Sequence, residues 1–530
     1  MSDERIGVIL CGCRNSAVHV WIASADELRK GDPSRIIRIG NGLCQHPDRL
    51  EEFLVCEKYK RVVIAACHSE EQGPRFTEMA ERAGVSPFHL EVVDLAFLSR
   101  LSPYDAIATA CVLIQAARER LRSLGEIGPE NLKPSLLPAD GRVSRRDLLL
   151  SLLRPRYQVV PSVQAELCVA WKGCARCIET CPQQAISLEE GRARVEKLKC
   201  VSCGACLPVC PVGAIRQPLL RPERLEAELQ ALLSGDRIVL EPRVLLVQAG
   251  GTPLRETAFH VPFLPLRLPS IGALSPWLLL RAFSLGADAV VVLPCGEGCR
   301  HGCLLERWEQ TLGFVRQLLD ALGIRGERLQ VYSASMEGST IVNDLEEFFE
   351  RIRGMGPPRL GQSPVMKGVQ EGLAGLIHAL AAGNNGVPPL RGEQVPFGIV
   401  TVTEGQRTCT LCGACPGRCP TEALTLKEDS AGSRLLFDHG RCIACRACVQ
   451  VCPEQVLHLD RALDFSRLTS PILLAEDRMV RCKRCGETIG PARMMDKVLG
   501  TLSRGASATH LRTLAELCPS CRIFGAVGVR

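Results

Sequence analysis

The sequence predicts a multidomain chain of the α/β and α+β classes, in which parallel-sheet modules alternate with cysteine-rich segments. At 530 residues the chain can hold roughly three to five domains of ordinary size. Short apolar strands alternate with amphipathic helices in residues 1–125 and 240–355, which is typical of parallel sheets. The 29 cysteines recur at short spacings, and these spacings favour metal binding over disulfides in so long a chain.

In residues 1–125 we expect strands at 5–10, 35–40 and 61–66, and helices at 73–84 and 105–125. The carboxyl ends of parallel strands meet at one edge of a sheet, where binding sites are commonly built. The thiols that follow the three strands could therefore meet at that edge. They belong to Cys11, Cys13, Cys44 and Cys67. Cys56 and Cys111 lie in helical patterns and are expected in the core.

Two segments are expected to be linkers, because they are rich in proline together with charge or glycine. The first, residues 126–160, contains one expected helix at 144–153 with Ser144 as its cap. The second, residues 356–400, contains one helical patch. Between the linkers, residues 240–355 show strands at 243–248, 289–294 and 329–334, with a helix after each of the last two.

Residues 161–217 and 401–460 form an internal repeat, in which each copy holds two cysteine groups that end in Cys-Pro. In the second copy both groups follow the pattern C-x2-C-x2-C-x3-C-P. Three thiolates at this spacing bind three irons of one [4Fe-4S] cluster, and the fourth turns away to ligate the neighbouring cluster. The pattern therefore predicts one cluster at Cys409, Cys412, Cys415 and Cys452, and another at Cys442, Cys445, Cys448 and Cys419.

The first copy has five residues instead of two in its first gap, so the loop before Cys174 must bulge. The crossed assignment still applies. It predicts one cluster at Cys168, Cys174, Cys177 and Cys210, and another at Cys200, Cys203, Cys206 and Cys181. Sixteen buried thiols or a disulfide mesh would be the alternative, but two complete patterns rarely arise by chance.

Both repeats resemble bacterial-type dicluster ferredoxins, and this resemblance implies one-electron transfer. Basic side chains beside the clusters would favour the more negative reduced form, whereas solvated cations would have little effect. The candidates are Lys172, Arg176, Arg407, Arg418, Arg441 and Arg446.

Residues 475–530 contain two further Cys-x2-Cys pairs, separated by an expected helix at 492–502. Two such pairs suit a tetrahedral zinc ion, and "CKRCG" resembles a zinc-ribbon knuckle. A fifth iron–sulfur cluster is the alternative. The expected ligands are Cys482, Cys485, Cys518 and Cys521.

The α/β modules carry two further resemblances. Residues 61–95, together with "IGVILCGC", resemble the N-terminal domain of the A subunit of heterodisulfide reductase, which implies that the four convergent cysteines ligate a cluster; small core residues are the alternative. Residues 243–355, with "VVLPCGEGC", resemble the delta subunit of methyl-viologen-reducing hydrogenase, an iron–sulfur protein that passes electrons to heterodisulfide reductase. The family's other cysteines are absent here from 244–251 and 268–274. Either one loop holds a cluster alone or the module only docks a partner. The loop's candidate ligands are Cys295, Cys299, Cys303 and His301.

Composition narrows the function further. Aromatic content of 4% gives little base-stacking surface for nucleic acid, and four thiolate-ligated clusters would offset the formal charge of +6. The apolar stretch 261–283 is interrupted by Arg267 and Arg281, so we expect no membrane span and a cytoplasmic protein. No G-x-G-x-x-G joins a strand to a helix and no Walker A motif occurs, so FAD and NAD are expected on a partner.

These observations predict a non-catalytic electron-transfer subunit with four [4Fe-4S] clusters and zinc, and no catalytic residue is assigned. By resemblance, it would relay electrons between a hydrogenase, formate or other dehydrogenase and a heterodisulfide-reductase-like or flavin-containing partner in anaerobic metabolism. A self-contained reductase of a disulfide or thiol is one alternative, although no two cysteines are adjacent. A redox sensor is another, although no helix-turn-helix output domain is evident.

Overall fold

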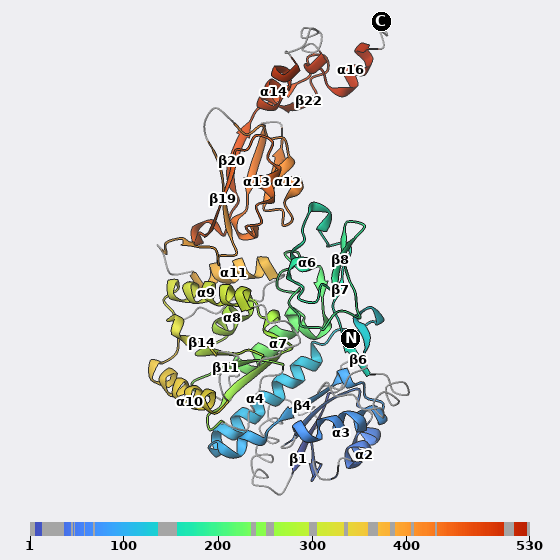
Figure 1. The fold of residues 1–530 in the computed structure, drawn as a ribbon, viewed down its shortest axis with the longest axis vertical. Coiled ribbons are helices and arrows are strands. Elements are labelled where there is room, and N and C mark those ends of the chain that lie inside the picture. Colours follow the sequence, from blue (N-terminus) through green and yellow to red (C-terminus); the bar gives the residue numbers. More distant parts are fainter. Residues whose placement is uncertain are drawn as a thin grey trace. The chain divides into compact units, whose positions relative to one another are not determined.

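The chain is described here from a computed structural model (Figure 1). It describes residues 6–12, 37–43, 46, 48–57, 59–66, 69–135, 156–234, 240–250, 259–295, 305–332, 338–358, 369–381, 387–403, 408–429, 432–502 and 514–526. These residues divide into two compact units, and each is described by itself. The first comprises 1–165, 176–189 and 193–364, and the second comprises 166–175, 190–192 and 365–530.

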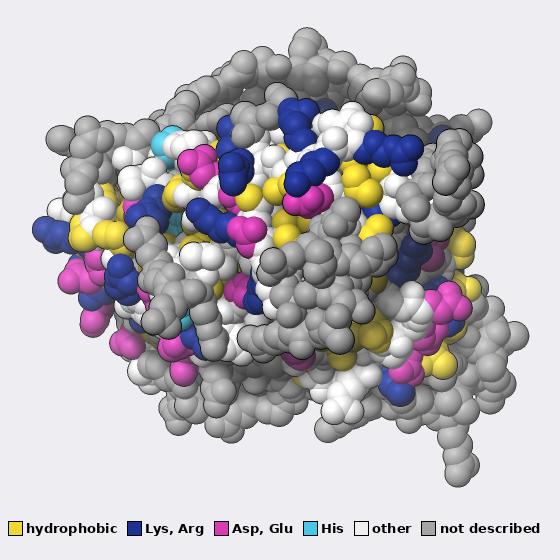
Figure 2. Space-filling model, turned by 90° about the horizontal axis from the view of Figure 1, so that it is seen from above, with side chains coloured by type: hydrophobic (Ala, Val, Ile, Leu, Met, Phe, Trp, Pro, Cys, Tyr) yellow, Lys and Arg dark blue, Asp and Glu magenta, His cyan; other side chains and the backbone are white. Residues whose placement is uncertain are grey.

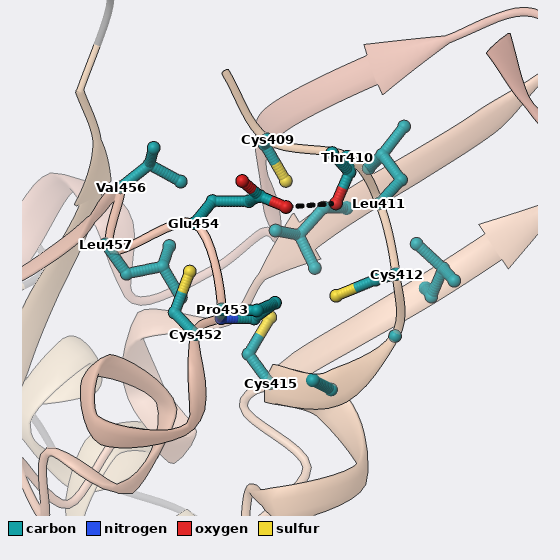
Figure 3. Close-up of a pocket in the computed structure, with 14 residues that line it drawn as sticks. Cys409, Thr410, Leu411, Cys412, Cys415, Cys452, Pro453, Glu454, Val456 and Leu457 are labelled. Carbon is teal, nitrogen blue, oxygen red and sulfur yellow. Dashed lines mark hydrogen bonds between the residues drawn. The ribbon is translucent and has the colours of Figure 1, made fainter. Parts of the chain in front are cut away.

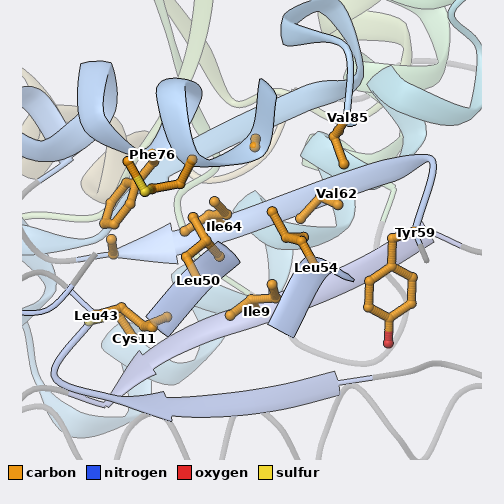
Figure 4. Close-up of a cluster of buried hydrophobic side chains, with 13 residues drawn as sticks. Ile9, Cys11, Leu43, Leu50, Leu54, Tyr59, Val62, Ile64, Phe76 and Val85 are labelled. Carbon is orange, nitrogen blue, oxygen red and sulfur yellow. The ribbon is translucent and has the colours of Figure 1, made fainter. Parts of the chain in front are cut away.

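The first unit begins with a parallel four-stranded sheet in the order β2-β1-β3-β4. Its strands are β1 (Ile6–Gly12), β2 (Ile37–Asn41), β3 (Arg61–Ala66) and β4 (Leu90–Asp94). Helices α2 (Asp48–Glu57) and α3 (Ser69–Arg82) bury Leu50 and Phe76 against Ile9 and Ile64 of the sheet (Figure 4). Helix α4 (Pro103–Arg122) contacts β3 and β4. The predicted parallel sheet is therefore confirmed.

A second parallel sheet, also of four strands, has the order β12-β11-β13-β14. Its strands are β11 (Val244–Ala249), β12 (Phe263–Leu268), β13 (Ala289–Leu293) and β14 (Leu329–Val331). Helices α9 (Leu305–Ala321) and α10 (Gly338–Met355) follow β13 and β14 as the sequence predicts, and α8 (Pro276–Ser284) follows β12. Phe349 of α10 packs edge-on against Phe263 with ring centroids 5.6 Å apart.

Helix α7 (Pro222–Leu233) lies between the two parallel-sheet modules and is absent from the sequence-based expectations. It packs along α4 of the first module and contacts α8 of the second (Figure 1). Arg120 of α4 forms an ion pair with Glu228 of α7 at 2.6 Å, and Arg281 of α8 pairs with Glu226 of α7 at 2.5 Å. The two modules of this unit are therefore joined through one shared helix.

The first cysteine repeat has little regular structure. Strands β7 (Ser162–Val163) and β10 (Ile215–Arg216) pair antiparallel around it, and α6 (Arg176–Thr180), β8 (Ile186–Glu189) and β9 (Arg192–Val195) lie within it. The preceding linker contains an unpredicted antiparallel pair, β5 (Leu132–Ser135) and β6 (Arg156–Val159). The helix expected at 144–153 lies outside the described residues.

The second unit contains the second repeat, built on two antiparallel sheets. The first sheet has the order β15 (Leu390–Arg391), β19 (Leu457–Leu463) and β16 (Gly398–Val402). The second sheet has the order β17 (Leu424–Glu428), β18 (Ser433–Phe437) and β20 (Ile472–Asp477). Short helices α12 (Ala414–Arg418) and α13 (Ala447–Val451) follow the cysteine loops, and α11 (Val369–Ala381) is the helical patch expected in the second linker.

The C-terminal segment contains β21 (Met479–Arg481), β22 (Thr488–Pro491), α14 (Ala492–Leu502) and α16 (Pro519–Ala526). Helix α14 has the bounds that the sequence predicts. Among the described helices of the whole chain, none combines the length and the apolar character that crossing a membrane requires. On the face in Figure 2, Lys and Arg side chains of described residues are interspersed with Asp and Glu.

Candidate iron–sulfur and metal centres

The best-defined centre lies in the second repeat, where four cysteines line one pocket that is partly open to solvent. The loop before α12 contributes Cys409 and Cys412, α12 itself contributes Cys415, and Cys452 follows α13. Their sulfur atoms point toward one another (Figure 3). Glu454 and Thr410 also line this pocket and hydrogen-bond at 3.4 Å. The four thiols belong to Cys409, Cys412, Cys415 and Cys452.

The electrostatics of this pocket suit a positively charged metal core. Burial, followed by the neighbouring thiolates, raises the pKa of the Cys415 thiol to about 12. The pKa of Cys409 is also raised, first by burial and then by Cys412 and Cys452. Four thiolates in a small apolar pocket repel one another, so they need a cation to be held deprotonated. This donor set fits a cluster.

The second cysteine set of this repeat lies beside the first. The pKa of Cys442 is raised to about 12 and that of Cys448 to about 11, first by burial and then by neighbouring thiolates that include Cys419. Cys448 also raises the pKa of Cys415 in the first set. A Cβ atom at Gly398 would lie 3.1 Å from the Cys442 sulfur, so the backbone of β16 closes this site. The structure thus brings together the predicted set Cys442, Cys445, Cys448 and Cys419.

In the first repeat the structure brings together Cys200, Cys203, Cys206 and Cys181, which line one pocket that is partly open to solvent. The pKa of Cys206 is raised well above its usual value, first by burial and then by the thiolates of Cys203 and Cys200. The backbone N–H of Ala185 donates to the Cys181 sulfur at 3.2 Å, and that of Ser202 donates to the Cys200 sulfur at 3.4 Å. Such N–H groups stabilise thiolates.

The remaining predicted set is distributed over the two compact units. Cys168 and Cys174 belong to the second unit, whereas Cys177 and Cys210 belong to the first. The backbone N–H of Ala214 donates to the Cys210 sulfur at 3.1 Å, the same kind of contact that Ala185 makes to Cys181. This set stays a prediction from the spacing.

The Cys203 loop packs against the segment 268–274, which follows β12. The hydroxyl of Ser270 donates to the Cys203 carbonyl oxygen at 3.2 Å. A Cβ atom at Gly204 would lie 2.8 Å from Ala273, and one at Gly272 would lie 2.9 Å from Ala205. The segment that lacks the family's cysteine is therefore in direct contact with a cysteine set of the first repeat.

The C-terminal cysteines form a more compact group. The sulfur atoms of Cys482, Cys485, Cys518 and Cys521 all lie within 4.8 Å of one another, and those of Cys485 and Cys518 are 3.6 Å apart. A tetrahedral ion with Zn–S bonds of about 2.3 Å spaces its ligands about 3.8 Å apart. A cubane spaces them more widely, because each sulfur binds a different iron. A backbone hydrogen bond from Cys518 lowers the pKa of Cys482 to about 6, which favours a metal-binding thiolate.

The other candidate cysteines are only partly described. Cys11, at the end of β1, is fully buried in the first hydrophobic core near Leu43 (Figure 4), which favours a packing role. Cys295 is buried at the end of β13. The expectation of core positions is confirmed for Cys111 but wrong for Cys56, which lies exposed on the outer face of α2. Outside the described residues lie Cys13, Cys44, Cys67, Cys299, Cys303, His301 and Arg407.

Three parts of the chain match models of known protein families. Residues 255–356 match the family model of the methyl-viologen-reducing hydrogenase delta subunit. Residues 168–214 and 401–453 each match a model of a 4Fe-4S dicluster domain.

Three curated relatives illustrate the similarity. The vhu iron-sulfur D subunit of the F420-non-reducing hydrogenase of Methanocaldococcus jannaschii is 36% identical over 94 residues, which are 17% of this chain and 70% of the relative. The first iron-sulfur A subunit of the CoB–CoM heterodisulfide reductase of Methanopyrus kandleri is 30% identical over 257 residues, 40% of this chain and 38% of the relative. A ferredoxin of Alicyclobacillus acidocaldarius is 41% identical over 63 residues, 12% of this chain and 80% of the relative. Through its second α/β module the chain belongs to the family of the methyl-viologen-reducing hydrogenase delta subunit, and it carries two 4Fe-4S dicluster domains in addition.

Proposed function

We propose that this iron–sulfur electron-transfer chain relays single electrons through four [4Fe-4S] clusters. The donor would be a hydrogenase or another dehydrogenase, and the acceptor would be a heterodisulfide-reductase-like or flavin-containing subunit. The relatives support this choice of donor and acceptor, because their names describe iron–sulfur subunits of a hydrogenase and of a heterodisulfide reductase. They support an electron relay rather than a self-contained reductase or a sensor.

One observation carries the proposal. In the second repeat, helices α12 and α13 contact each other, and Cys415 of one set and Cys448 of the other, which lie on these helices, belong to one packed cluster of side chains. Clusters in these two sets would therefore be neighbours. Two redox centres must lie close together for an electron to pass from one to the other. A [4Fe-4S] cluster supplies one-electron chemistry with little change of geometry. The protein residues ligate it, exclude water and supply N–H groups to its sulfur ligands.

For the C-terminal segment we propose one structural zinc ion bound by Cys482, Cys485, Cys518 and Cys521. The short sulfur–sulfur distances support a single ion over a fifth cluster. All four positions are filled by protein ligands, which is typical of structural rather than catalytic zinc. This ion would join the loop after β21 to helix α16.

The first test is the content of iron, acid-labile sulfide and zinc per chain after anaerobic purification. Four clusters require about 16 iron atoms. We expect about 16 iron and one zinc. About 8 iron would contradict the assignment of two clusters to each repeat.

A pair of double variants tests the crossed ligation. Cys409→Ala with Cys452→Ala removes two ligands from one predicted cluster, so iron falls by about 4 while the neighbouring cluster keeps its electron paramagnetic resonance signal. Cys409→Ala with Cys419→Ala removes one ligand from each cluster and disturbs both signals. The opposite pattern would mean that each four-cysteine motif binds its own cluster. The buried core cysteine provides the control, because Cys111→Ala leaves iron unchanged.

A further inference from the structure

The loop between Cys168 and Cys174 makes a direct contact with the second dicluster domain. Residues 166–175 belong to the same compact unit as residues 365–530. The Nζ atom of Lys172 donates a hydrogen bond to the carbonyl oxygen of Cys419 at 3.2 Å and lies 3.8 Å from Glu422 Oε1. The Lys172 side chain is only 9% exposed, whereas that of Glu422 is 63% exposed. A nearly buried ammonium group therefore lies on the backbone of a proposed cluster ligand.

The longer cysteine gap of the first repeat builds this contact. Its additional residues form a turn of 3-10 helix, Ala170–Lys172, which ends at Gly173 with φ of 82°. This left-handed conformation favours glycine. A Cβ atom at Gly173 would also overlap the guanidinium of Arg418, so glycine allows the loop to approach α12 closely. Lys172 lies over the ring of Trp171, 5.3 Å from its centroid, which orients the ammonium group.

The position of Lys172 has an electrostatic consequence. A cluster that accepts one electron gains one negative charge, and no bond forms or breaks. The ammonium group stabilises that charge through the hydrogen-bonded backbone of Cys419, and its burial limits screening by water and salt. The opposing carboxylate of Glu422 is mostly solvated, so it offsets this effect only weakly.

We propose that Lys172 raises the reduction potential of the cluster ligated by Cys419. The proposal rests on the proposed function of the four cysteine sets. The electron is supplied by the donor named in the proposed function, so no further reductant is required.

The potential is tested by redox titration of the full-length, cluster-loaded chain, monitored by electron paramagnetic resonance. Lys172→Gln should lower the equilibrium constant for reduction of one cluster about tenfold, which is about 59 mV for a one-electron couple. Lys172→Arg keeps the charge and should restore most of the potential. Lys199→Gln is the matched control, because Lys199 precedes Cys200 but is 58% exposed and should have little effect on any potential. The component that shifts should be absent from Cys442→Ala with Cys445→Ala, which removes the cluster shared with Cys419.

A second readout tests the contact itself. Carbodiimide should link the Lys172 amine to the Glu422 carboxylate, and mass spectrometry should detect the joined peptides in the native chain but not in Glu422→Gln. The proposal is overturned if Lys172→Gln leaves every potential unchanged, whether or not the cross-link forms. It is also overturned if no cross-link forms. Iron content is measured in parallel, because a value well below 16 would indicate failure of the cluster assignment instead.

Discussion

The ion pair between Arg281 and Glu226 offers a quantitative test of how the two α/β modules are joined. Arg281 lies on α8 and Glu226 on α7, and their side chains are only 4% and 8% exposed. The Nε atom of Arg281 donates to both carboxylate oxygens of Glu226 at 2.9 Å. Glu226→Gln keeps the shape of the side chain but removes its charge, so the buried guanidinium loses the carboxylate that accepts its hydrogen bonds.

Breaking a buried ion pair by neutralising one partner typically costs about 3–5 kcal/mol, because the remaining charge is desolvated without compensation. At about 1.4 kcal/mol per factor of ten, this corresponds to a roughly 100- to 4,000-fold increase in local opening. An exposed pair provides the control. Arg82 and Glu78 on α3 lie 2.7 Å apart but are each 45% exposed, so Glu78→Gln should change stability by about 0.5 kcal/mol or less. The ion-pair distances are similar in the two pairs, so the expected difference in stability loss comes from the difference in burial.

Hydrogen exchange measured by mass spectrometry on the full-length chain is the suitable assay, because it reports the opening of α7 and α8 separately from other elements. Amides of both helices should exchange faster in Glu226→Gln. The double variant Glu226→Leu with Arg281→Met should recover most of the protection, since two apolar side chains leave no unpaired charge. Equal protection in Glu226→Gln and Glu78→Gln, or a double variant as open as the single one, would refute this account of the interface.

Three further predictions concern the second unit. Burial lowers the pKa of His439 below 6.5, and its ring bonds Gly398 O and Asp464 N–H in the neutral form. The contribution of neutral His439 to stability is therefore present above pH 6.5 and is lost as the pH falls toward the pKa of the folded state. The urea midpoint should fall from high to low pH for this reason, and the His439→Gln variant should lack this part of the pH dependence. Gly398→Ala should reduce iron content by crowding the Cys442 sulfur, whereas Gly417→Ala, which meets no atom within 4 Å, should leave iron analysis unchanged. Cys518→Ser should abolish bound zinc but keep about 16 iron by elemental analysis; loss of both metals would contradict separate sites.

Local patterns in the sequence predict much of this structure. The apolar run 61–66 coincides with β3, and the helix expected at 492–502 coincides with α14. The spacing rule also predicts which cysteines meet in the second repeat, because the crossed ligation is a property of the local motif.

Contacts between distant segments were not predictable in this way. Leu225, Leu229 and Leu232 follow Pro222 at helical spacing, so this pattern would have identified α7. No periodicity indicates that the same helix pairs Glu228 with Arg120 of another module. Likewise, the missing cysteine in 268–274 gives no sign that Ser270 would contact the Cys203 loop. Such pairings depend on tertiary packing rather than on neighbouring residues.

The contact between Gly204 and Ala273 determines how much protein separates the Cys203 set from the far side of residues 268–274. Electron tunnelling slows exponentially as the gap between redox centres widens, so the thickness of the intervening side chains controls the rate. Here the facing side chains are no larger than hydrogen or methyl, and an added Cβ at Gly204 would already lie 2.8 Å from Ala273. A redox centre seated against residues 268–274 would be separated from the Cys203 set by about the thinnest layer that a polypeptide can form. Enlarging Ala273, which is not beside a proposed ligand in the sequence, would thicken this layer and slow transfer across it.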